Sequence, residues 1–173
     1  MWRPAPDNSK RSNYFRFERN ERTTLFTEKE FKEIISSITA YDLVAYGELE
    51  PFYKKLADWL KIDRTSILLT SGSDAGIKAI YESYVSKNDK IIITLPNYAM
   101  FSVYAEMFGA KIVHYYYEKD LSLNTNGLIE LLDTNTKMVV ISNPGHTGSI
   151  VPEKKLIDII KTAGEKTHER ATT

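Results

Sequence analysis

The chain has 173 residues, which suits about one domain and is long enough to bury a hydrophobic core. Its 23 Lys and Arg residues balance 23 Asp and Glu residues, and this zero net charge argues against nucleic acid or an anionic membrane as the main partner. Cysteine is absent, which excludes disulfides and a thiol nucleophile, and the three histidines have no metal-ligand spacing. No apolar run approaches the roughly 18 residues of a membrane span. The polar, basic N-terminus is unlike a secretory signal, so we expect a cytoplasmic protein.

Residues 1–26 have the character of an N-terminal arm, because prolines interrupt them and their charges have no period. A disordered tail and a docked arm both remain open. Thr27 and Glu30 form a capping-box pattern, which predicts a helix with an apolar face after Thr27. Pro51 suits the first turn of a second helix.

A phosphate-binding turn is predicted after an apolar strand at Ile67–Thr70. The small residues Ser71, Gly72 and Ser73 follow, and a helix is expected to start near Asp74. The first turn of a helix has unpaired N–H donors and a partial positive charge, so it binds phosphate well. Gly72 lets a phosphate approach the backbone, and Ser73 adds a hydroxyl donor.

An aromatic ring follows the next predicted strand, Ile91–Leu95, at Tyr98. A phosphate cradle with an aromatic ring at the neighbouring strand end predicts a phosphorylated planar ligand. A loop at Asn143–Gly148 follows a later strand in the same way, so the ligand groups should meet at the carboxyl ends of the strands.

The rest of the chain alternates between helices and strands, which implies crossover connections and a mainly parallel sheet covered on both faces. After Lys166 this pattern predicts another strand, but residues 167–173 do not continue it. We therefore expect an aberrant tail at 167–173 and an unpaired apolar sheet edge. The remaining predicted elements are a helix at Met100–Phe108, a strand at Lys111–Tyr117, a short helix at Gly127–Asp133, a strand at Lys137–Ser142 and a helix at Pro152–Ala163.

Three motifs in order resemble the fold-type-I pyridoxal-phosphate-dependent aminotransferases, and the histidinol-phosphate-aminotransferase-like branch in particular. They are Gly72-Ser73-Asp74, Pro96-Asn97-Tyr98 and Asn143-Pro144-Gly145-His146-Thr147-Gly148. The resemblance covers roughly Asn20 to Lys166, about the first half of a family member. It implies that residues 27–166 form part of a three-layer α/β/α cofactor-binding large domain, incomplete at its C-terminal end.

The resemblance also implies roles for single residues. Gly72, Ser73 and Asp74 would bind the phosphate of pyridoxal 5'-phosphate, largely through backbone N–H groups, and Tyr98 would stack on the pyridine ring. Tyr46 would reach the cofactor phosphate of a neighbouring subunit, which implies a homodimer. The family asparagine that bonds the ring hydroxyl aligns with Gly145, which has no side chain, and Asn143 is the candidate substitute.

The activity that the resemblance implies is transfer of an amino group between an amino acid, possibly histidinol-phosphate-like, and a 2-oxo acid. In the family, the Schiff-base lysine, the aspartate at the pyridine nitrogen and the arginine for the substrate carboxylate lie beyond the end of this chain. We therefore assign no catalytic residue and expect the chain alone to be inactive. Two alternatives stay open: a non-catalytic remnant that binds phosphate or cofactor weakly, and an amino-acid decarboxylase of the same family. The lack of a G-x-G-x-x-G motif disfavours a dinucleotide-binding module.

Overall fold

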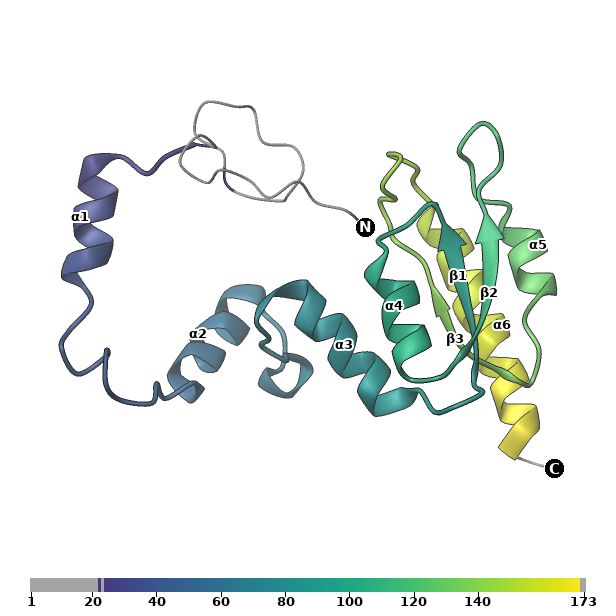
Figure 1. The fold of residues 1–173 in the computed structure, drawn as a ribbon, viewed down its shortest axis with the longest axis horizontal. Coiled ribbons are helices and arrows are strands. Elements are labelled where there is room, and N and C mark those ends of the chain that lie inside the picture. Colours follow the sequence, from purple (N-terminus) through teal and green to yellow (C-terminus); the bar gives the residue numbers. More distant parts are fainter. Residues whose placement is uncertain (1–21, 23, 172–173) are drawn as a thin grey trace. The chain divides into compact units, whose positions relative to one another are not determined.

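A computed structural model describes residue 22 and residues 24–171 of the chain (Figure 1). The chain divides into two compact units, residues 1–64 and residues 65–173, which are described separately. Most of the predicted arm at 1–26 lies outside the described residues. The predicted boundaries at residues 27 and 166 stay predictions.

In the described part of the first unit, two α-helices begin at the signals found in the sequence. Helix α1 spans Glu28–Ser36, and its predicted capping box is confirmed: Thr27 Oγ1 accepts from the Glu30 amide and the Glu30 carboxylate accepts from the Thr27 amide. Helix α2 spans Glu50–Leu60 and has its proline in the first turn, as predicted. Arg64, at the start of the short 3-10 helix η2 (Arg64–Ser66), donates through two nitrogens to Glu50 and lies 3.6 Å from the ring centroid of Tyr53.

The second unit is built around a parallel sheet. Strands β1 (Lys90–Leu95), β2 (Lys111–Tyr116) and β3 (Thr136–Val140) pair in the order β2-β1-β3. At the centre, Ile92 is in register with Val113 on one side and Val139 on the other. All described pairs are parallel, which confirms the predicted sheet.

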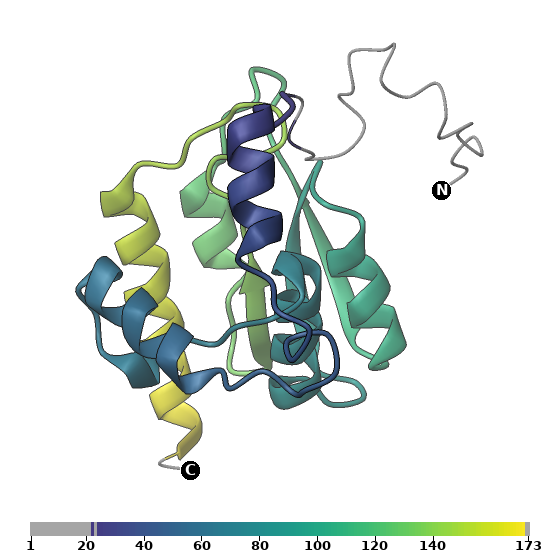
Figure 2. The same cartoon turned by 90° about the vertical axis from the view of Figure 1, so that its left-hand side faces the viewer.

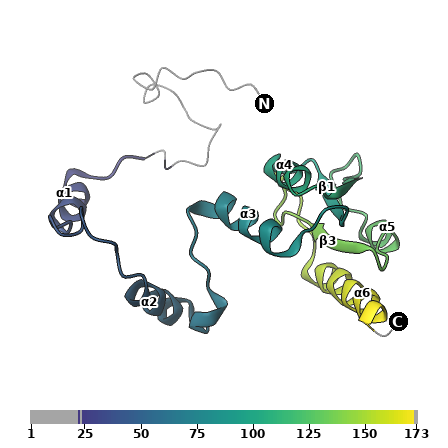
Figure 3. The same ribbon diagram turned by 60° about the horizontal axis from the view of Figure 1, so that its bottom comes forward.

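Helices cover both faces of this sheet, as Figures 2 and 3 show with α4 and α6 on opposite sides of the strands. Because side chains alternate along a strand, Ile91 and Ile93 of β1 pack with one pair of helices, and Ile92 packs with the other. The first pair is α3 (Gly72–Tyr84) and α4 (Met100–Met107), and the second is α5 (Thr125–Glu130) and α6 (Glu153–Ala171). The predicted three-layer α/β/α arrangement is confirmed.

The strand predicted at Ile67–Thr70 is not formed, and this prediction was wrong. Residues 67–70 are not part of any described sheet, and the Leu68 side chain is 71% exposed. A strand needs a neighbour with which to form a ladder, and an apolar run alone does not supply one. Helix α3 nevertheless begins at Gly72, two residues before the predicted start at Asp74.

The C-terminal region also differs from the prediction, because α6 continues to Ala171 instead of ending at Ala163. The single glycine at Gly164 does not end the helix, and no helix-breaking proline follows it from Glu165 onward. The backbone of residues 167–171 therefore extends α6, and the aberrant character of 167–173 stays a prediction.

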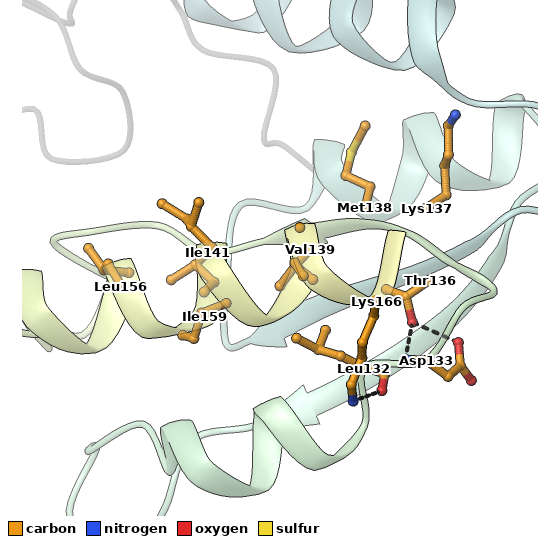
Figure 4. A pocket seen from close by; sticks show the side chains of 13 residues that line it. Leu132, Asp133, Thr136, Lys137, Met138, Val139, Ile141, Leu156, Ile159 and Lys166 are labelled. Atoms are coloured by element: carbon orange, nitrogen blue, oxygen red, sulfur yellow. Dashed lines mark hydrogen bonds between the residues drawn. The ribbon is translucent and has the colours of Figure 1, made fainter. Parts of the chain in front are cut away.

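Among the described strands, β2 and β3 form the two edges of the sheet, and β3 pairs with β1 on one side and with no described strand on the other. A cavity of about 380 Å³ lies beside this edge, between β3 and α6 (Figure 4). Val139 and Ile141 line it from the sheet side, and Leu156 and Ile159 line it from α6. Lys166 closes one end by donating to the backbone carbonyl of Leu132. The unpaired apolar edge expected from the sequence is located here.

Candidate functional site

The start of α3 offers hydrogen-bond donors to a ligand. Gly72 has a φ of +83°, a conformation that glycine adopts at low cost, and its amide donates to Thr70 O at 2.8 Å. Ser71 at the N-cap makes no side-chain capping bond, and the first amides of a helix have no partner within it. A Cβ added at Gly72 would have no described atom within 4 Å, so the space before the helix is open.

Two tyrosines hold the carboxylate of Asp74 in the first turn of α3. The Tyr98 hydroxyl donates to Oδ1 at 3.2 Å, and the Tyr104 hydroxyl donates to Oδ2 at 2.9 Å. The bond to Asp74 raises the pKa of Tyr104, because deprotonation would place two anions side by side. Asp74 therefore joins the start of α3 to the residues after β1.

A polar network fixes the turn that carries Tyr98. Asn97 Oδ1 accepts from the Tyr98 amide at 2.8 Å and from the Ser142 hydroxyl at 2.6 Å. Below it, the fully buried Thr94 donates to the Val140 carbonyl at 3.2 Å. These bonds tie the carboxyl end of β1 to that of β3, so Tyr98 and the loop after β3 are held at the same edge of the sheet.

The loop after β3 is closed on itself. The Asn143 side chain donates to Val151 O at 3.1 Å and accepts from Val151 N at 2.9 Å, and Gly145 N donates to Ser149 O at 2.8 Å. A Cβ at Gly145 would collide with the Ser149 hydroxyl, so a larger side chain at this position would require that hydroxyl to move. His146 projects from the loop, and its ring is parallel to the Tyr98 ring within 4°, with the centroids 6.4 Å apart.

The structure brings four predicted site residues to one place: Gly72, Ser73, Asp74 and Tyr98. Asn143 follows Ser142 in the adjoining loop, and its role as a cofactor ligand stays a prediction. Tyr46 belongs to the other unit, where its side chain is fully exposed, and its role also stays a prediction.

Sequence reasoning assigned no site role to two residues that the structure places here, Tyr104 and His146. The one available signal for Tyr104 is its hydroxyl, because a buried phenol needs a partner and the Asp74 carboxylate is a suitable acceptor. No described group of His, Asp and Glu residues is arranged to hold a metal ion.

Comparison with known proteins identifies the family. The model of the family "Aminotransferase class I and II" matches residues 12–168. The chain belongs to this family. This finding confirms the resemblance drawn from the three motifs. Among the described helices, none combines the length and the apolar content needed to cross a membrane.

The matched relatives are longer than this chain. The histidinol-phosphate aminotransferase of Clostridium novyi (strain NT) is 32% identical over 138 residues, which cover 77% of this chain and 39% of the relative. The crystal structure of histidinol-phosphate aminotransferase from Sinorhizobium meliloti, in complex with pyridoxal-5'-phosphate, has a TM-score of 0.67 at 20% identity and is matched over 79% of this chain and 37% of its own. An amino transferase from Eubacterium rectale has a TM-score of 0.70 at 19% identity, over 82% and 38%. These structural matches show the shared fold, and the chain spans about two fifths of each relative.

Proposed function

We propose that this chain is the cofactor-binding part of a pyridoxal-phosphate-dependent aminotransferase that acts on a histidinol-phosphate-like amino acid and a 2-oxo acid. The observation that carries the proposal is the bond from Tyr98 to Asp74, which puts an aromatic ring beside the open first turn of α3. Family membership and the histidinol-phosphate aminotransferases among the relatives support it. The activity of the whole protein is part of the proposal, because this chain spans about two fifths of those relatives.

The donors at α3 suit a phosphate group. The amides of Ser73 and Asp74 lie in the first helical turn, and the helix dipole adds partial positive charge there. The Asp74 carboxylate would repel a phosphate dianion, but both of its oxygens accept from tyrosine hydroxyls. In this proposal Asp74 therefore binds phosphate through its amide and holds Tyr98 through its side chain.

The ring of Tyr98 would orient the planar part of the cofactor. When bound, pyridoxal phosphate supplies an electron-accepting ring that stabilises negative charge developing on the substrate. Tyr98 contributes a flat apolar face, and the bonds that Asp74 and Asn97 make to it fix the direction of that face. We assign no lysine of this chain to the Schiff base. We propose that the Schiff-base lysine lies in the part of the aminotransferase fold that this chain does not span.

Two further roles complete the proposal. Asn143 would keep the loop after β3 at the cofactor, through the bonds of its side chain to Val151. The exposed Tyr46 would contact the cofactor phosphate of a second subunit, and the protein would act as a homodimer.

A matched pair of glycine variants tests the phosphate cradle. Gly72→Ala and Gly109→Ala both place a Cβ on a residue with positive φ, +83° and +71°, so both introduce similar backbone strain. At Gly109 the Cβ would meet the flexible Lys87 side chain, whereas at Gly72 it would enter the open space before α3. We expect Gly72→Ala to weaken the binding of pyridoxal 5'-phosphate about tenfold, or about 1.4 kcal/mol.

The measurement is an equilibrium titration with pyridoxal 5'-phosphate, competed with inorganic phosphate. Gly109→Ala should change the Kd by less than about twofold. Equal losses in the two variants would show that strain, and not the cradle, controls binding. Absence of cofactor binding by the unsubstituted chain would reject the proposed function.

A further inference from the structure

Helices α1 and α3 each carry an acidic residue at their third position, but the two side chains make different bonds. In α1, the Glu30 carboxylate reaches back and accepts from the amide of the N-cap residue, Thr27, at 2.8 Å. In α3, both carboxylate oxygens of Asp74 accept from tyrosine hydroxyls instead. An acidic side chain in the first turn of a helix is suited to bind the amides there. The sequence of α3 therefore supplies a capping group, and the structure engages it with tyrosines.

Tyr104 is the tyrosine that the core fixes in place. Its side chain is buried in the apolar cluster that contains Ile91, and its ring centroid lies 6.1 Å from that of Tyr81. Its hydroxyl donates to Asp74 Oδ2 at 2.9 Å, which is shorter than the 3.2 Å bond from Tyr98 to Oδ1. The bond to Asp74 also raises the pKa of Tyr104, so the hydroxyl keeps its proton at neutral pH. A buried ring thus presents a fixed donor to the Asp74 carboxylate.

A phosphate group at the start of α3 needs the donors that a capping carboxylate would use. The amides of the first helical turn have no partner within the helix, and a Cβ added at Gly72 would meet no described atom within 4 Å. If the Tyr104 hydroxyl were removed, Oδ2 of Asp74 would lose its donor, and the first-turn amides of its own helix would be a replacement. A carboxylate bound there would compete with phosphate for the same N–H groups and would repel it.

We propose that Tyr104 is a positioning residue, which keeps the phosphate-binding amides of α3 free by holding the Asp74 carboxylate. Tyr104 does not touch the phosphate and acts through Asp74 alone. This inference rests on the proposed function, which places the phosphate of the cofactor at Gly72–Asp74. It predicts that a hydroxyl on α4 contributes to the affinity for any phosphate group bound at the start of α3.

Inorganic phosphate is the probe, because it tests the cradle without the cofactor ring. Tyr104→Phe removes the hydroxyl and keeps the ring, whereas the control, Ile91→Val, removes one buried carbon from the same cluster. We expect Tyr104→Phe to raise the Kd for phosphate about three- to fivefold, as for the loss of one hydrogen bond, and Ile91→Val to change it by less than about twofold. If Tyr104→Phe does not fold, the comparison is repeated with Tyr81→Phe in both chains, since that variant removes a buried hydroxyl without a described partner.

Two readouts separate positioning from structural support. Asp74→Asn removes the competing charge, so adding Tyr104→Phe to that variant should change the Kd for phosphate by less than about twofold. The second readout is hydrogen exchange of the backbone amides of Ser71–Asp74. In Tyr104→Phe the released carboxylate should cap the helix, so at least one of these amides should exchange more slowly than in the unsubstituted chain. A loss of packing alone would make them exchange faster.

The outcomes distinguish this inference from the proposed function. If the unsubstituted chain binds phosphate and pyridoxal 5'-phosphate but Tyr104→Phe binds both equally well, the inference is wrong and the proposed function stands. If Tyr104→Phe weakens binding equally with and without Asp74→Asn, or if Ile91→Val weakens it as much, Tyr104 only supports the fold and the inference is again wrong. If the unsubstituted chain binds neither probe, both proposals fail.

Discussion

Replacement of Tyr81 by phenylalanine should stabilise the second unit. The Tyr81 side chain is 1% exposed, and its hydroxyl has no hydrogen-bond partner among the described residues. Such a hydroxyl costs about 1–3 kcal/mol, whereas the ring packs against Tyr104 with or without it. We expect Tyr81→Phe to raise the free energy of unfolding by about 1 kcal/mol, which moves the urea midpoint up by about 0.3–1 M when unfolding is followed by circular dichroism.

The same variant makes a prediction about alkaline pH. Burial raises the pKa of the Tyr81 hydroxyl from its usual 10.0 to about 12. The folded state binds this proton more tightly than the unfolded state. The free energy of unfolding is therefore unaffected by this group below about pH 10 and falls as the pH rises toward 12, by about 2.7 kcal/mol when the loss is complete. Tyr81→Phe has no proton to lose, so its advantage over the unsubstituted chain should grow to about 3–4 kcal/mol near pH 12.

Tyr104→Phe is the matched control, because it removes the same atom from a ring in the same apolar cluster. Its hydroxyl donates to Asp74 at 2.9 Å, and a bond to a charged group is worth about 1.5–3 kcal/mol when buried. Tyr98 continues to donate to Asp74, so we expect a loss of about 1–2 kcal/mol. If Tyr81→Phe destabilises as much as Tyr104→Phe, the Tyr81 hydroxyl has a partner and the reasoning is refuted.

Two further predictions concern the first unit and the lysines. Arg64→Lys removes the paired bonds to Glu50 and the stacking on Tyr53. The amides of α2 should therefore exchange hydrogen faster than in the unsubstituted chain, while the exchange of the β1 amides should not change. If the α2 amides exchange at the same rate in both chains, the Arg64 contact does not hold the helix. Borohydride reduction of the chain with pyridoxal 5'-phosphate should leave no lysine stoichiometrically labelled in a peptide map, because no lysine is assigned to the Schiff base. A single complete adduct would identify one that we have missed.

Local signals predicted much of the fold. The capping box at Thr27, the proline at the start of α2 and the apolar run of β1 act within a few residues, so they can be found without a partner. Alternation of helices with strands was sufficient to predict a parallel sheet with helices on both faces, since crossover connections impose that arrangement. The predicted phosphate-binding turn rests on the same kind of local signal, because its donors come from the start of a single helix.

Features that depend on distant partners were not predictable in the same way. The apolar run at Ile67–Thr70 has the composition of a strand but no described ladder partner. The bonds from Tyr98 and Tyr104 to Asp74 join residues 24 and 30 positions apart, and no spacing rule reports them. The parallel rings of Tyr98 and His146 depend on the order of β1 and β3 in the sheet, which the sequence does not specify.

The most direct test of the cofactor-binding proposal is an amide NMR map of the chain during titration with pyridoxal 5'-phosphate. We predict that the amides of Gly72, Ser73 and Asp74 shift first and furthest, together with that of Tyr98, and that inorganic phosphate reproduces the shifts at α3 but not at Tyr98. Shifts confined to the groove between β3 and α6, or no saturable shifts at all, would contradict the account.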